Sequence, residues 1–457
     1  MDLAQYNLMG DFRVSGHWWL PSRPEERIAG TLSYSRDAGV RLELTGVFSS
    51  PEFDSVGFLS QPRSVRLELV LGSDADSQPF TLHKLDLLQL SSTSAFRVSY
   101  LLVGKHFLSP DEIAFGSARI QYTHLEAWSC YQHTRSAKSV TPDCFSLEVP
   151  TSVATLLRTN ETGAAKEISL HAYTWQSFTL GLVELKPSAY FSIEFAEKTD
   201  LRTAFAIGND LGQLMTMLIG EPSYVKKLRL FDKSDTAVEV FYPSTIRAEG
   251  EIHPLEMSFS LHDLANVAPM IVEKWFASLP VLEPVYDLLF GTLFGRDSFV
   301  RTKFLSLTQA IESFHRRTYG GRYTSVEDFT TLEAVLKAAV PTLTSKPLSR
   351  RISDSIKYAN EYSLRKRIKE LLRGLTPATA QMLKLSDAAG CADLLVKTRN
   401  YLTHFDEQSR TKLVDDIVAM HHMNERLTAL LFILVLKRLG LAEETAARGI
   451  LKRRFFQ

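Results

Sequence analysis

The chain has 457 residues, too many for a single hydrophobic core, and this length predicts two or three domains. Its composition, with 45% hydrophobic and 23% charged residues, is typical of a folded protein and excludes a disordered chain. The net charge of zero conceals an asymmetry: residues 1–295 hold 24 Lys and Arg against 35 Asp and Glu, whereas residues 296–457 hold 28 against 17. This balance is typical of a polyanion-binding effector joined to a different module, or it reflects compositional drift between domains.

The beginning of the sequence, MDLAQYNLMG, lacks the basic and apolar segments of a secretory signal. The three cysteines, Cys130, Cys144 and Cys391, are too few for a disulfide framework and suit a reducing compartment. We therefore expect a cytoplasmic protein that does not bind a membrane.

Strands are predicted through residue 262 by alternating polarity and by β-branched and aromatic residues. The segment Ile28–Phe48 predicts a hairpin that turns at residues 37–39. Further strands are expected at 64–72, 96–104, 117–128, 167–185, 189–195, 226–231, 237–243 and 256–261. This spacing is typical of a β-sandwich or a barrel. Residues 200–220 interrupt it with helical spacing that begins behind Asp200.

From residue 263 the apolar residues recur with a period near 3.6, which predicts a helical bundle. Helices are expected at 264–291, 299–320, 325–341, 364–375, 391–404 and 411–440. The apolar run Leu427–Leu436 is too short to span a bilayer and predicts a buried helix. The expected fold class is α+β with several domains: β-rich, sandwich-like regions at 1–150 and 151–262, which form one domain or two, and an all-α bundle at 263–457.

The stretch Lys397–Glu407 places Arg399, Asn400 and His404 within six residues. Cleaving RNA without a metal requires attack by the neighbouring 2′-hydroxyl on its own phosphate, a group that moves protons, and a fixed cation. Histidine titrates near neutrality, and arginine offers a planar fork for phosphate oxygens. Asn400 can orient either residue or hold a phosphate oxygen. The alternative is a solvated arginine and a histidine that caps a helix end.

Helix geometry constrains this motif, because positions five apart on an ideal helix lie roughly 140° apart around its axis. Arg399 and His404 therefore do not form a pair on one helix face. Either the helix is irregular here, or a second copy of the segment completes the site across a two-fold axis.

Arg-Asn-x-x-x-His in a late helix of a basic bundle resembles the Arg-x(4–6)-His motif of HEPN ribonucleases. RNYLTH, with the preceding LTQAIESFHRR segment, is similar to the ApeA-like HEPN subgroup of bacterial anti-phage proteins. Residues Gly10–Ser35, with a Trp-Leu-Pro element and a following Gly-Thr-Leu, resemble the beginning of the ApeA N-terminal domain. The two regions bracket nearly the whole chain, although the middle carries no motif that we can match.

The resemblance implies a β-rich sensor followed by a HEPN nuclease that dimerises and cuts host RNA, with tRNA as the expected substrate, on phage infection. It implies catalytic roles for Arg399 and His404, with Asn400 as the polar residue of the motif. Glu312 lies where some HEPN proteins hold an acidic partner. We expect no metal or cofactor, and we expect the acidic N-terminal region to restrain the nuclease until a phage-derived trigger binds.

The helix predicted at Leu364–Gly374 is basic and amphipathic. It either presents a solvated face or contacts the phosphate backbone beside the cleft. The candidate RNA-binding residues are Arg365, Lys366, Arg367 and Lys369.

Two other functions stay open. A HEPN bundle can serve as a non-catalytic module for dimerisation and RNA binding, with the β region as a ligand binder. A glycan-binding β-sandwich with a helical oligomerisation tail would use Trp18 and Trp19, although core packing is commoner for tryptophan in a β domain.

A zinc site is the remaining candidate, because His124, Cys130, His133 and Cys144 follow one another closely. Their spacing lacks the paired short intervals of tetrahedral zinc sites. We therefore expect core and cross-strand positions for these residues, and no metal.

Overall fold

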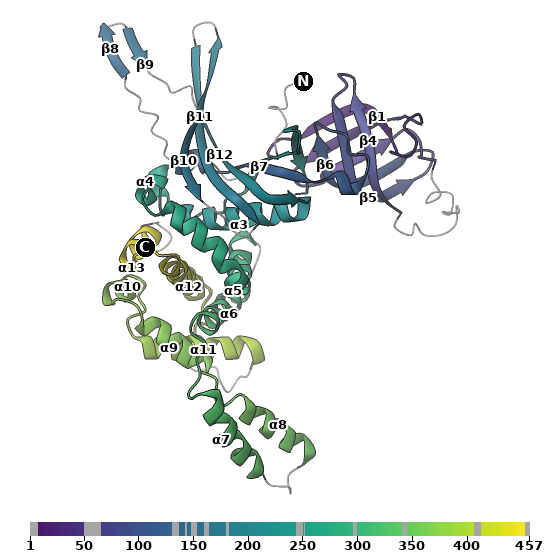
Figure 1. Ribbon diagram of the computed structural model, residues 1–457. Helices are drawn as coiled ribbons and strands as arrows, with labels where there is room; N and C mark the ends of the chain where they lie inside the picture. The colour runs from purple at the N-terminus through teal and green to yellow at the C-terminus, as the bar shows by residue number, and fades with distance from the viewer. Residues whose placement is uncertain are drawn as a thin grey trace. The chain divides into compact units, whose positions relative to one another are not determined.

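The computed structural model describes residues 8–49, 65–129, 137–141, 144–147, 153–159, 164–179, 182–243, 250, 252–295, 299–340, 345–405 and 413–452. The chain divides into two compact units, Met1–Phe276 and Ala277–Gln457, and the boundary falls inside helix α5 (Ala268–Phe294). The first unit carries the strands and the second is helical, which confirms the α+β fold class (Figure 1).

Six strands of the first unit close into an antiparallel barrel. Their order is β6-β3-β2-β1-β4-β5, and β5 pairs back with β6. They are β1 (Phe12–Trp19), β2 (Ile28–Ser35), β3 (Gly39–Leu44), β4 (Arg66–Asp74), β5 (Pro79–Leu90) and β6 (Ser94–Val103). The predicted hairpin is β2–β3, with Gly39 at a φ of 73°. Of the two architectures that the strand spacing left open, the structure has the barrel.

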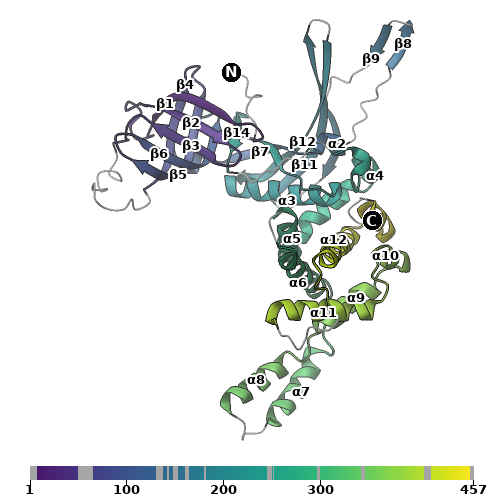
Figure 2. The ribbon, with the colours of Figure 1, turned by 180° about the vertical axis from the view of Figure 1, so that it is seen from behind.

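Strand β6 continues the barrel into a second group of strands. Its first half pairs with β3, and residues Leu101–Val103 pair with β14, so both groups form one hydrogen-bonded sheet. The second group has the order β14-β13-β7-β12-β11-β10. Figure 2 labels β14, β7, β12 and β11 of this group. Its strands are β7 (Phe115–Tyr122), β10 (Ala154–Thr159), β11 (Ala165–Thr179), β12 (Leu182–Thr199), β13 (Val225–Phe231) and β14 (Ala237–Phe241), and β8 (Ala137–Thr141) and β9 (Cys144–Leu147) pair separately.

Helix α3 (Leu201–Ile219) confirms the helix predicted at 200–220. The carboxylate of Asp200 accepts a hydrogen bond from the backbone N–H of Thr203 at 2.8 Å, and Gly220 ends the helix with a φ of 87°. The helix packs against β7 and β13. Gly208 allows a close approach to β7, because a Cβ at this position would lie only 3.1 Å from the side chain of Ile120.

Three strand predictions are wrong in detail. Residues 167–185 form β11 and the start of β12 rather than one strand. Residues 117–128 form β7 and then the short helix α2 (Leu125–Trp128). Residues 256–261 form no strand, because Ser260 and Asp263 make a capping box that begins helix α4 (Leu261–Leu264), after the short helix η3 (Pro254–Glu256).

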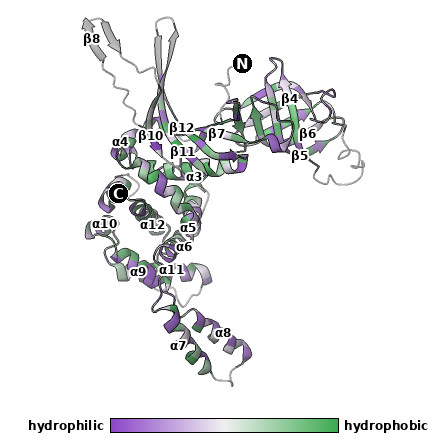
Figure 3. Ribbon diagram, in the orientation of Figure 1, coloured by the Kyte–Doolittle hydropathy of each residue, from purple (hydrophilic) through white to green (hydrophobic). Residues whose placement is uncertain are grey.

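Both tryptophans of the N-terminal segment are buried: Trp18 belongs to the barrel core, and Trp19, on the opposite face of β1, packs against Arg27 and His106. Trp18 is 0% and Trp19 is 5% exposed, and a Cβ on Gly72 would overlap the ring of Trp18. Hydrophobic and hydrophilic residues alternate along the barrel strands, as expected where successive side chains point to opposite faces (Figure 3). Burial within the chain therefore explains both tryptophans, and the glycan-binding interpretation loses its support.

The second unit consists of helices around the apolar helix α12, in which Leu427–Leu436 is buried apart from one half-buried position, as predicted. Its other helices are α6 (Val300–Tyr319), α7 (Val326–Ala338), α8 (Lys346–Lys357), α9 (Leu364–Arg373), α10 (Pro377–Met382), α11 (Ala388–His404) and α13 (Glu443–Leu451), and α12 itself covers Ile417–Arg438. Helices α8, α10 and α13 lie outside the segments that were predicted to be helical. Among the described residues, no helix is long and apolar enough to cross a membrane.

Candidate functional site

Helix α11 carries the Arg-Asn-x-x-x-His motif and is held against α9 and α6. Asp387 begins the helix by accepting a hydrogen bond from the N–H of Gly390 at 2.9 Å. The hydroxyl of Thr398, on the buried face, accepts a hydrogen bond from the N–H of Val414 at 3.1 Å. The helix ends at His404, because Phe405 adopts the left-handed conformation with a φ of 50°.

The three motif residues lie in the C-terminal part of this helix, which ends at His404. Arg399 is half-buried, whereas Asn400 and His404 are exposed. The guanidinium Nη1 of Arg399 donates a hydrogen bond to the Oδ1 of Asn400 at 3.2 Å. The amide oxygen of Asn400 therefore restrains the arginine fork, while the imidazole of His404 faces solvent.

Arg399 and His404 both belong to one uninterrupted α-helix, so an irregular helix does not explain their spacing. Their positions lie roughly 140° apart around the helix axis. A single copy of α11 thus places the cation and the imidazole on different faces.

Glu312 on α6 belongs to a different cluster. Its carboxylate binds Arg316 one turn later at 3.3 Å, and Arg316 also binds Glu361 at 2.7 Å. The structure therefore pairs Glu312 with Arg316 rather than with a residue of the α11 motif.

The predicted RNA-binding residues of α9 are largely engaged within the chain. The guanidinium of Arg365 binds Asp393 on α11 at 3.0 Å. The ammonium of Lys366 lies over the rings of Tyr323 and Tyr362, at 4.2 and 3.7 Å. Lys369 is half-buried.

Arg367 does not lie on the surface where we expected it. It is 1% exposed, and its guanidinium donates to the backbone carbonyl oxygens of Tyr362, at 3.0 Å, and Gly320. Burial lowers the pKa of this guanidinium, yet arginine keeps its proton at any ordinary pH. The side chain fastens α9 to the end of α6 and is unavailable to a phosphate.

His315 is a buried histidine that the sequence analysis did not single out. Its Nδ1 lies 3.2 Å from Nη1 of Arg367, and its Nε2 lies 3.0 Å from the carboxylate of Glu370. Because a guanidinium can only donate, Nδ1 accepts a hydrogen bond from Arg367. Nε2 therefore carries the hydrogen and donates a hydrogen bond to the carboxylate of Glu370. The available signal was its position in register with the apolar residues Leu307, Ile311 and Phe314 of α6.

Burial lowers the pKa of His315 below its ordinary value of 6.5, with Arg367 adding to the effect and Glu370 opposing it. Below about pH 6.5 the unfolded chain therefore binds more protons than the folded one, and stability falls as the pH drops towards the lower folded-state pKa. We expect the melting temperature of the helical unit to fall between about pH 7.5 and pH 5.5, and His315→Gln to weaken this dependence. An unchanged dependence in His315→Gln would contradict this, and His421→Gln, at an exposed histidine, is the control.

The zinc candidates are only partly described. His124 precedes α2 in the left-handed conformation, whereas Cys130, His133 and the side chain of Cys144 lie outside the described residues. Within the described ranges, no group of three or more His, Cys, Asp or Glu side chains is placed to hold a metal ion.

Comparison with protein families gives two matches. The model of ApeA N-terminal domain 1 matches residues 13–275, which is more than half of the chain. The model of the Apea-like HEPN domain matches residues 305–445, which include α11 and Glu312. Searches of curated proteins and of solved structures gave no match. The chain therefore belongs to the ApeA-like proteins, with an ApeA N-terminal domain 1 followed by an Apea-like HEPN domain.

Proposed function

We propose that this protein is an anti-phage effector whose HEPN domain is a metal-independent endoribonuclease acting on host RNA. The ApeA-like and HEPN domains support an anti-phage effector of the HEPN type. The observation that supports nuclease activity is the arrangement at the end of α11. There the side chain of Asn400 restrains Arg399, and His404 is exposed to solvent. Retention of both motif residues favours an enzyme over a non-catalytic RNA-binding module.

The mechanism follows from what these side chains can do. The 2′-hydroxyl attacks the adjacent phosphorus while a His404 imidazole takes its proton, and the bond to the 5′-oxygen then breaks as the imidazolium returns a proton to that leaving oxygen. The products are a 2′,3′-cyclic phosphate and a 5′-hydroxyl. Arg399 stabilises the charge that develops on the phosphorane oxygens, and Asn400 fixes its direction. No step requires a metal ion.

The active species is a homodimer in this proposal. HEPN domains usually dimerise and act on RNA. A two-fold axis beside α11 brings Arg399 of one copy towards His404 of the other and forms one cleft, which the 140° separation within a single helix does not provide. The resemblance to ApeA-like HEPN proteins makes tRNA the proposed substrate.

The N-terminal region restrains the nuclease until a phage-derived trigger binds. The support is electrostatic, because residues 1–295 carry a net charge of −11 and residues 296–457 carry +11. An acidic module can compete with RNA for a basic one. A nuclease that cuts host RNA without restraint would also kill its own cell.

The test compares three chains in a phage-challenged host: the full protein, its His404→Ala variant, and residues 263–457, which keep α5 whole. Sequencing of RNA 5′ and 3′ ends is expected to show discrete new ends with cyclic phosphates for the full protein after infection. The shortened chain should produce such ends, and toxicity, without infection. His404→Ala should produce none.

Three outcomes would contradict the proposal. Equal protection by the full protein and His404→Ala, without new RNA ends, would place the non-catalytic binding module first. A shortened chain no more toxic than the full one would remove the restraint. Loss of cleavage when EDTA is added to a lysate of challenged cells would remove the metal-independent mechanism.

A further inference from the structure

Helices α7 and α8 form a hairpin that contributes little to the core of the helical unit (Figure 1). Among the described residues of the two helices, Phe329 alone is buried, and α8 has no buried residue. Most helical stability in proteins comes from packing an apolar face. The hairpin therefore needs an explanation other than core formation.

The surface of α8 is divided into an apolar stripe and a basic remainder. Leu348, Ile352 and Ile356 recur every four residues and form one stripe, whose two isoleucines are half-buried in a helix that packs on α7. The rest of the helix surface, which flanks this stripe on both sides and which we call the α8 basic face, carries four exposed cations with one exposed carboxylate: Lys346, Arg350, Arg351, Lys357 and Asp354. A helix of this length spans about 18 Å, enough to contact several consecutive phosphates.

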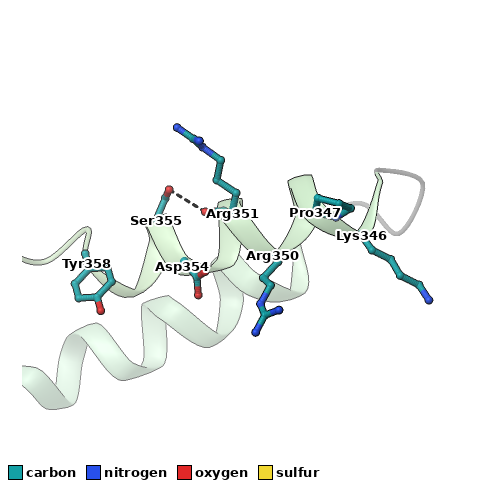
Figure 4. Close-up of a pocket in the computed structure, with 7 residues that line it drawn as sticks. All are labelled: Lys346, Pro347, Arg350, Arg351, Asp354, Ser355 and Tyr358. Atoms are coloured by element: carbon teal, nitrogen blue, oxygen red, sulfur yellow. Dashed lines mark hydrogen bonds between the residues drawn. The ribbon is translucent and has the colours of Figure 1, made fainter. Parts of the chain in front are cut away.

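Residues of α8 and the Tyr358 that follows it line an open region of the surface: Lys346, Pro347, Arg350, Arg351, Asp354, Ser355 and Tyr358. Figure 4 shows the extended side chains of Lys346, Arg350 and Arg351, with Arg350 and Tyr358 on one side of the helix and Arg351 on the other. Within the described part of the chain, these three cations form no ion pair. They differ in this from the cations of α9, where Arg365 binds Asp393 and Arg367 is buried.

Two neighbouring features suit a nucleic-acid ligand. Tyr358, which follows α8, is 60% exposed and can stack on an unpaired base. The base of the hairpin is fixed by Asn360, whose side chain accepts hydrogen bonds from the N–H groups of Tyr323 and Thr324 and donates one to the carbonyl of Thr324. The cations are thus presented on an anchored support rather than on a free segment.

We propose that the α8 basic face binds the phosphate backbone of the RNA substrate, and that Tyr358 stacks on one of its unpaired bases. This rests on the proposed nuclease function and names where its substrate is held. A second copy of the chain is the other occupant that an exposed helix face can take. A symmetric contact between two such faces would bring like charges together, which disfavours it.

The test measures RNA affinity by anisotropy of a fluorescein-labelled stem-loop RNA, with the full chain carrying His404→Ala so that the probe survives. Arg350→Glu with Arg351→Glu removes two cations that neutralise phosphates. This charge reversal should reduce affinity at least about tenfold at low salt and make the slope of log K against log salt shallower by about 1.4. Arg350→Lys with Arg351→Lys should keep the slope. Tyr358→Ala should cost about tenfold with the slope unchanged.

The matched control is Arg438→Glu with Arg448→Glu, which makes the same charge change on exposed residues of α12 and α13. It should leave affinity within about twofold. Equal affinity and slope for the α8 charge reversal and its parent would overturn the proposal, as would a changed sedimentation coefficient with unchanged RNA affinity, which indicates a protein contact. If the α8 charge reversal loses RNA binding but the wild type makes no new RNA ends, RNA binding by the α8 basic face is supported and the nuclease function is contradicted.

Discussion

His404→Ala is expected to lower the rate at which new RNA ends accumulate after infection by about 10²–10⁴-fold, the usual contribution of a positioned acid–base group. Arg399→Ala is expected to cost about 10²–10³-fold, the size of a lost charge-stabilising donor. Both residues lie at the open end of α11, so neither substitution should change the free energy of unfolding by more than about 0.5 kcal/mol. Asn400→Ala should give a smaller loss, because it removes only the restraint on the Arg399 fork.

The matched control for His404→Ala is His421→Ala, which removes another exposed imidazole, one that contacts Glu425 on α12. It should cleave RNA like the wild type. Full activity in both His404→Ala and Arg399→Ala would show that the motif residues have no catalytic role. They would then be surface side chains at the end of α11, where the histidine is only the last residue of the helix.

Mixed dimers test the geometry. Neither the Arg399→Ala chain nor the His404→Ala chain should cut RNA alone, but a dimer of the two retains one arginine and one histidine. If the two residues act across the two-fold axis, co-expression should restore about a quarter of the wild-type activity, because about half of the dimers are mixed and each mixed dimer has one complete pair out of two. If both must come from one chain, that mixture stays inactive, and a mixture of wild type with the double variant retains about half of the wild-type activity instead of the roughly one quarter expected for pairs across the axis.

The placement of the proposed catalytic residues on one helix could be predicted from the sequence, because Arg399, Asn400 and His404 fall within a segment of helical spacing that the structure has as α11. The hydrogen bond between Arg399 and Asn400 could not, since it depends on rotamers that packing selects. The ion-pair cluster that contains Glu312 could not be predicted from the sequence either. The partner of Glu312, Arg316, lies one turn away, but the third member, Glu361, comes from a segment more than forty residues later.

The fold shows the same division between local and distant information. Asp200 and Gly220 mark both ends of α3 in the sequence, and the hairpin of β2 and β3 was visible from its turn. Closure of the barrel was not, because it requires β5 to pair with β6 while β6 also pairs with β3 and β14. Helix α8 was missed although its apolar residues Leu348, Ile352 and Ile356 follow helical spacing.

Arg367 shows how a local pattern can mislead. In the sequence it belongs to a run of four cations, which favours a solvated or phosphate-binding face. In the helix it lies beside Ile368 and one turn before Leu371, on the buried stripe of α9. What the sequence could not reveal is that the carbonyl of Gly320, the carbonyl of Tyr362 and the ring of His315 converge there to receive it.

Arg367→Ala is accordingly expected to destabilise the helical unit by about 3–5 kcal/mol, the usual cost of removing one member of a buried charged network. The substitution leaves two backbone carbonyls without their donor and removes the contact that orients His315. Arg365→Ala, two residues earlier, removes only an exposed ion pair with Asp393 and should cost less than about 1 kcal/mol.

Hydrogen exchange on the full chain is the suitable measurement, because two units need not unfold in one step and exchange reports each helix separately. Amides of α6 and α9 should lose protection in Arg367→Ala and keep it in Arg365→Ala. Arg367→Lys should recover little, since an ammonium cannot reproduce the planar fork that reaches two carbonyls and the imidazole. If Arg367→Ala instead kept full protection while weakening RNA binding and its salt dependence, the guanidinium would be reaching solvent, and α9 would return as the surface that holds the phosphate backbone.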